Sequence, residues 1–157
     1  MNIYVYPTSI KITGNIFEPK NVDEAKFSLK YNLAVALTKG GFTLKDLDVD
    51  NTMNEDILNV IRKTEIISDP SLENRELGIR GARVEIVMKD GSSNVSQVNL
   101  PKGDPETQVT NDDMMSKMAS CAEGLFDKRR QEDIFKCINR IDEIEDIGML
   151  FELLKLD

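Results

Sequence analysis

The segment from Asp23 to Gly41, which reads DEAKFSLKYNLAVALTKGG, constrains the fold more than any other part of this chain. At helical spacing one face carries Phe27, Leu33, Ala34 and Leu37, while other faces carry Leu29, Val35 and Ala36. A helix that is apolar nearly all round is buried on more than one side. Glycines 40 and 41 end it, because glycine readily adopts the left-handed conformation of a helix end. We therefore expect one interior helix, Asp23–Lys39.

A second pattern predicts a β-hairpin. Apolar and polar residues alternate from Ala82 to Lys89, which is typical of a half-buried strand. Asp90-Gly91 then favours a tight turn, because both positions can take positive φ, and residues 95–100 form the returning strand. We expect this hairpin, Arg83–Leu100, to lie in a sheet with the interior helix packed across it. That packing would bury Phe27, Leu33 and Leu37.

Two further strands are expected. The first covers Asn2–Tyr6 and continues through Ile10–Ile12, with a break at Pro7, because these residues are mostly β-branched or aromatic. The second covers Thr64–Ser68. Residues 71–81 are polar and indicate a loop.

Helical patterns occupy the remaining segments. Thr43–Asp50 indicates a short helical turn, and Thr52 with Glu55 matches a capping box that opens a helix through Ile57, Leu58 and Ile61. Thr110 with Asp113 matches another helix-capping pattern. Two apolar stripes follow near the end of the chain, formed by Ile134, Ile138 and Ile141 and by Ile147, Leu150 and Leu154. The order of elements predicts an α+β fold, in which helices pack on one face of a mainly antiparallel sheet and are followed by C-terminal helices. We expect a domain at residues 1–126 and a helical extension at residues 127–157.

The composition excludes several classes of function. A net charge of −8 with a pI near 4.7 disfavours nucleic acid and anionic membranes, which require a basic surface. No apolar run has transmembrane length, and the first residues lack the pattern of a signal peptide, so we expect a cytoplasmic protein. Cys121 and Cys137 are expected to be two free thiols, with a disulfide between them as the alternative.

The residues also argue against chemistry carried by this chain alone. There is no histidine, no CxxC pair and no glycine-rich phosphate loop, so we expect no metal site, no cofactor and no catalytic residue. The acidic residues of the C-terminal helices allow two interpretations: paired carboxylates for acid–base catalysis, or a solvated helix face. These residues are Glu132, Asp133, Asp142, Glu143, Glu145 and Asp146.

Three motifs in one order carry a resemblance to a known family. They are Phe27-Ser28-x-x-Tyr31, the Asp90-Gly91 turn, and the PKGDP segment that ends at Pro105. Together they resemble the C-terminal part of the MmgE/PrpD family, which includes 2-methylcitrate dehydratase, cis-aconitate decarboxylase and iminodisuccinate epimerase. The resemblance implies a smaller, lid-like domain that covers the active-site cleft of an enzyme acting on small di- or tricarboxylates. The histidines and lysines of such an enzyme come chiefly from a larger helical domain.

The resemblance also implies roles for particular residues. Tyr31 and Ser28 would contact substrate, whereas the alternative is that the Tyr31 ring packs in the helix and its hydroxyl finds a local partner. Gly103, Asp104 and Pro105 would form a structural turn, with ligand contact as the alternative.

Two functions follow from these observations. The chain is either the substrate-covering domain of an MmgE/PrpD-type lyase or isomerase, inactive in isolation, or a stand-alone ligand-binding or interaction module with the same fold. The first requires a separate helical domain as partner, with the chain being part of a longer enzyme or a naturally short product. We also expect a homodimer formed through the apolar stripes of the C-terminal helices.

Overall fold

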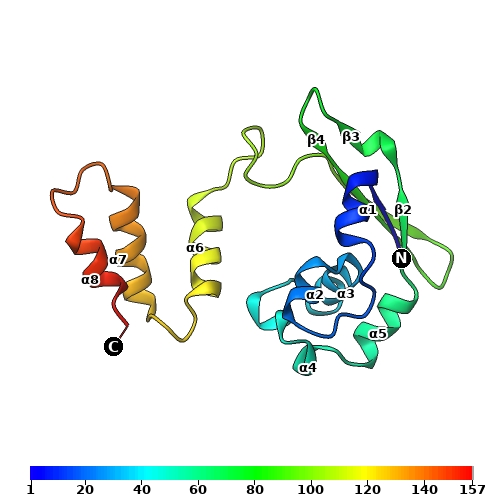
Figure 1. Cartoon of the computed structure of the whole chain (residues 1–157), viewed down its shortest axis with the longest axis horizontal. Coiled ribbons are helices and arrows are strands. Elements are labelled where there is room, and N and C mark those ends of the chain that lie inside the picture. Colours follow the sequence, from blue (N-terminus) through cyan, green and yellow to red (C-terminus); the bar gives the residue numbers. More distant parts are fainter. Residues whose placement is uncertain (157) are drawn as a thin grey trace. The chain divides into compact units, whose positions relative to one another are not determined.

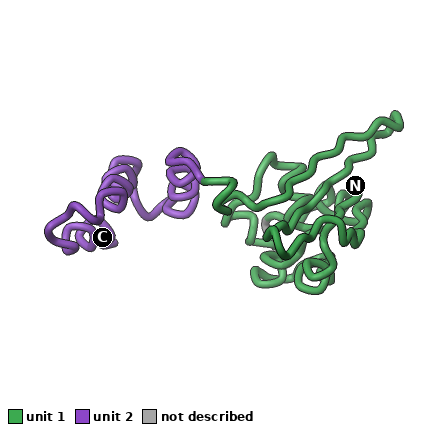
Figure 2. The backbone as a smooth tube through the Cα atoms, turned by 90° about the horizontal axis from the view of Figure 1, so that it is seen from above, with its two compact units in different colours: residues 1–108 green, residues 109–157 purple. Residues whose placement is uncertain are grey.

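The computed structural model describes residues 1–156 and divides the chain into two compact units, residues 1–108 and residues 109–157 (Figure 2). Among the described residues, no helix has both the length and the apolar character needed to cross a membrane.

The first unit contains a four-stranded sheet in the order β2-β1-β5-β6. Figure 1 shows the ribbon of the chain, with strand β2 of this sheet labelled. The strands are β1 (Asn2–Val5), β2 (Glu65–Ser68), β5 (Ala82–Val87) and β6 (Ser93–Val98). β1 pairs in parallel with β2, and the other two pairings are antiparallel. Ile3 and Val5 are buried on one face of β1, whereas Asn2 and Tyr4 on the other face are half-buried. The α+β class and the mainly antiparallel sheet are therefore confirmed.

The predicted hairpin is confirmed, but its turn differs from the expected one. Gly91 N–H donates to the Met88 carbonyl at 3.1 Å, and Met88 N–H donates to the Ser92 carbonyl at 2.8 Å. The loop therefore has three residues, of which only Gly91 has a positive φ, at 85°. A type I turn followed by a left-handed glycine is a common three-residue hairpin loop.

The expected interior helix is interrupted. It consists of α2 (Val22–Phe27) and α3 (Leu29–Lys39), separated by Ser28 in an extended conformation with φ −91° and ψ 101°. α3 packs against α5 (Glu55–Arg62) and buries Tyr31, Ala34 and Val35. The expected buried face is therefore wrong for Phe27 and Leu37, which are 50% and 47% exposed.

Several local expectations are corrected as well. Residues 7–13 form helix α1 (Pro7–Thr13) and not a continuation of the first strand, because a proline at the first helical position loses no needed hydrogen bond. The cap of α5 is Asn54, whose side chain accepts the Ile57 N–H at 3.1 Å, and not Thr52. Thr52 instead ends α4 (Val49–Thr52), which follows the predicted helical turn η1 (Leu44–Leu47). The polar loop holds a short turn, η2 (Pro70–Leu72), and a two-stranded ribbon of β3 (Glu73–Asn74) and β4 (Ile79–Arg80).

In the described part of the second unit, residues 109–156, there are three helices: α6 (Asn111–Cys121), α7 (Lys128–Asn139) and α8 (Gly148–Leu154). The capping box of Thr110 and Asp113 is confirmed at the start of α6. α7 packs against α8, and Ile134 and Leu150 are buried at 1% and 9% exposure. Cys121 and Cys137 are free thiols.

Candidate functional site

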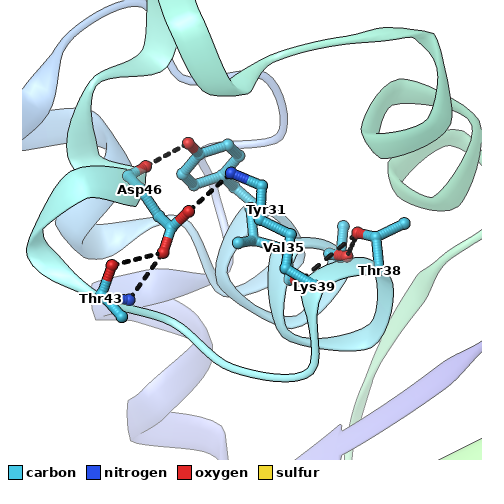
Figure 3. A network of polar contacts seen from close by, with 7 residues as sticks. Tyr31, Val35, Thr38, Lys39, Thr43 and Asp46 are labelled. Atoms are coloured by element: carbon cyan, nitrogen blue, oxygen red, sulfur yellow. Dashed lines mark hydrogen bonds and ion pairs between the residues drawn. The ribbon is translucent and has the colours of Figure 1, made fainter.

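The resemblance places Tyr31 at the centre of the candidate site, and the structure buries it completely. Its hydroxyl donates to the backbone carbonyl of Asp46 in η1 (Figure 3). Its ring meets the Phe42 ring edge to face, with centroids 6.1 Å apart. The pKa of Tyr31 is raised, chiefly because burial disfavours the phenolate. The hydroxyl is therefore a neutral donor that is already used within the domain.

The same segment is tied to α3 by an ion pair. Lys39 Nζ lies 2.7 Å from Asp46 Oδ1, and Asp46 Oδ2 accepts hydrogen bonds from the Thr43 backbone N–H at 2.8 Å and the Thr43 hydroxyl at 2.9 Å (Figure 3). Burial alone raises the pKa of Asp46, but the bonds from Lys39 and Thr43 outweigh it, so the pKa lies below its ordinary value. The side chains of Lys39 and Asp46 are 44% and 8% exposed. Asp46 therefore acts as a buried carboxylate that joins the end of α3 to η1.

Ser28 explains the spacing of the Phe27-Ser28-x-x-Tyr31 motif. Its hydroxyl accepts the Tyr31 N–H at 3.2 Å, the geometry of a helix N-cap, and donates to the Ile16 carbonyl at 2.7 Å. Both functions of the hydroxyl are thus used inside the fold, and the side chain is buried. A serine three residues before the tyrosine caps the helix that carries the tyrosine.

The PKGDP segment forms a hydrogen-bonded turn. Gly103 has a φ of 104°, which favours glycine, and its N–H donates to the Thr107 carbonyl at 2.7 Å. The Thr107 hydroxyl donates back to the Pro101 carbonyl at 2.5 Å. Asp104 N–H donates to the same carbonyl at 3.3 Å, and Pro105 lies exposed within the loop. The segment lies apart from Tyr31 in the sequence, and no hydrogen bond between them is described.

A second polar cluster covers the sheet face opposite Ile3 and Val5. Asn2 and Tyr4 both donate to Glu85, at 3.0 and 3.1 Å. Arg83 pairs with Asp69 at 3.1 Å and lies over the Tyr4 ring at 4.2 Å. Sequence reasoning missed this cluster, although the polar positions of the alternating strand 82–89 are the signal that marks it.

Several described groups have a pKa that departs clearly from its ordinary value. Hydrogen bonds from Ser71, Asn2 and Ser92 lower the pKa values of Asp69, Glu85 and Asp90 respectively. Together with the lowered pKa of Asp46 and the raised pKa of Tyr31, these shifts lead away from neutrality. Within residues 1–156, no group of three or more histidine, cysteine or carboxylate side chains is arranged to hold a metal ion.

Fold and site together define a small α+β domain whose polar clusters hold the fold together. The family model for the MmgE/PrpD C-terminal domain matches residues 1–142. The chain therefore belongs to the MmgE/PrpD family. No curated protein matches the chain.

Proposed function

We propose that this chain is the substrate-covering domain of an MmgE/PrpD-type lyase or isomerase that acts on small di- or tricarboxylates. The observation that carries the proposal is the match of residues 1–142 to the C-terminal domain of the family. The reaction class and the carboxylate substrate come from the family resemblance.

We further propose that the isolated chain does not turn over these substrates. Proton transfer at carbon near neutral pH needs a positioned group with a matched pKa. The sequence contains no histidine, and the clear pKa shifts move tyrosine up and carboxylates down. A separate helical domain in the same cytoplasmic compartment would supply the acid and the base.

Within this proposal Tyr31 and Ser28 position the α3–η1 segment. A direct contact between the Tyr31 hydroxyl and substrate requires that the hydroxyl leave the Asp46 carbonyl. The cost of that exchange is on the order of 1–3 kcal/mol for a buried acceptor left unpaired. The substrate contact that the resemblance implies for Tyr31 and Ser28 thus stays a prediction that depends on opening this segment.

Turnover assays test the proposal. The purified chain is incubated with 2-methylcitrate, cis-aconitate and iminodisuccinate, and product formation is followed against a buffer control. The Asp46→Ala variant, which loses the ion pair with Lys39, is purified and assayed in the same way. A contaminating host enzyme would give the same rate in the unmodified and the variant preparations. We expect no turnover above the control. A rate that increases with the amount of unmodified chain and is lower for Asp46→Ala would contradict the proposal.

A further inference from the structure

Strand β6 forms one open edge of the sheet. It is the outermost strand in the order β2-β1-β5-β6, and β5 is its one partner among the described residues. All six of its residues, Ser93–Val98, are exposed. An edge strand presents a row of backbone donors and acceptors that can pair with another strand.

The hairpin register shows which backbone groups face outward. Met88 and Ser92 share a hydrogen bond at the turn, and Val87 pairs with Ser93 at the next position. Bonded and non-bonded pairs alternate along an antiparallel ladder. The N–H and C=O groups of Ser93, Val95 and Gln97 therefore lie on the open edge.

Strand β6 itself has neither a charged side chain nor a proline, two of the features by which proteins usually prevent strand pairing. Charged side chains, prolines and covering elements are the usual protections. Residues 91–101 contain no charge, although charged residues make up 31% of the chain, and β6 itself contains no proline. The opposite edge differs, because β2 begins with the exposed Glu65 and contacts helix α1.

We propose that β6 pairs antiparallel with β6 of a second copy of this chain, with Val95 opposite Val95 of the other copy. A twofold contact places each residue against a residue of the same strand, so a charge there would often meet a like charge. In a chain with a net charge of −8, this uncharged strand avoids that repulsion. In the Val95-centred register Ser93 faces Gln97 and Asn94 faces Ser96, so polar side chains meet polar side chains.

The helical stripes expected to form the dimer are less suited to it. Ile134 and Leu150 are buried within the second unit, where α7 packs against α8. The groove beside them is rimmed by the charges of Asp133, Lys136, Arg140, Glu143 and Glu145. Ile138, which is 47% exposed, is the position at which a substitution tests this helical surface.

Light scattering over a concentration series tests the proposal with the 157-residue chain. We expect a mass that rises from 17.7 kDa toward twice that value, and Val95→Lys should hold the chain at 17.7 kDa. Val87→Lys is the matched control. Val87 is as exposed as Val95, at 56% against 58%, but it lies on the inner strand β5 and not on the open edge. That control should still dimerise.

A second variant addresses the backbone directly. Gln97→Pro removes an outward N–H, and proline is tolerated on edge strands at such positions. Circular dichroism confirms that the variant folds, and we expect it to be monomeric, whereas Gln97→Thr stays dimeric. Three results would overturn the proposal: a monomer at every concentration, equal effects of Val87→Lys and Val95→Lys, or a dimer lost in Ile138→Lys and retained in Val95→Lys.

Discussion

Tyr31→Phe separates a structural role for the Tyr31 hydroxyl from a role at substrate. The variant keeps the ring and its edge contact with Phe42 but removes the donor to the Asp46 carbonyl. Tyr31 is completely buried, so no water replaces the lost donor without rearrangement. A lost hydrogen bond of this kind lowers stability by about 1–2 kcal/mol. We expect the free energy of unfolding of the first unit to fall by that amount.

Urea denaturation followed by tyrosine fluorescence measures this change. All three tyrosines lie in residues 1–108 and the chain has no tryptophan, so the signal reports the first unit. With an m-value of about 1.5 kcal/mol/M, the midpoint should fall by about 1 M. Tyr6→Phe is the control, because it removes a hydroxyl from a half-buried ring of the same unit. A midpoint in Tyr31→Phe equal to that of the unmodified chain would refute the structural role.

Two further predictions concern charge and the second unit. Hydrogen bonds from Lys39 and Thr43 hold the pKa of Asp46 below its ordinary value. The contribution of the Asp46 carboxylate to stability is therefore complete above the unfolded-state pKa of about 4 and is lost as the pH falls through the lower, folded-state pKa. Asp46→Asn should lower stability at pH 7 by about 1.5–3 kcal/mol and flatten the acid limb of a stability–pH curve; an unchanged acid limb would contradict this. Leu150→Asp buries a charge against α7, at a cost above ~3 kcal/mol, and should remove the protection of residues 109–157 from hydrogen exchange. Leu156→Asp is the control: this position is 64% exposed, so protection should remain. Equal protection in both variants would show that Leu150 does not hold this unit together.

The parts of the fold that were predicted correctly depend on short-range signals. The hairpin follows from the alternation of residues 82–89 and from Gly91, and the α6 cap follows from Thr110 and Asp113. The break at Ser28 was not predicted, because Leu29 and its neighbours continue an apolar helical pattern through it. At the break, the Ser28 hydroxyl donates to the Ile16 carbonyl, which lies 12 residues away in the sequence.

The candidate site was predictable only as a set of residues. The Ser28-x-x-Tyr31 spacing marks a helix cap, but nothing local indicates that the Tyr31 hydroxyl reaches the Asp46 carbonyl 15 residues further on. Lys39 and Asp46 likewise meet across the end of α3, where Gly40 has a φ of 81°. Contacts of this kind depend on how α3 and η1 pack, which periodicity does not specify.

Reconstitution with a separately produced helical domain of the same family tests the central claim most directly. The two chains are mixed at increasing concentrations of this domain, and the initial rate is measured with 2-methylcitrate, cis-aconitate and iminodisuccinate in turn. The account predicts no rate for either chain alone and a rate with one of these carboxylates that saturates as this domain is added. A rate from this chain alone, or a complex of the two chains that binds substrate and gives no turnover, would contradict it.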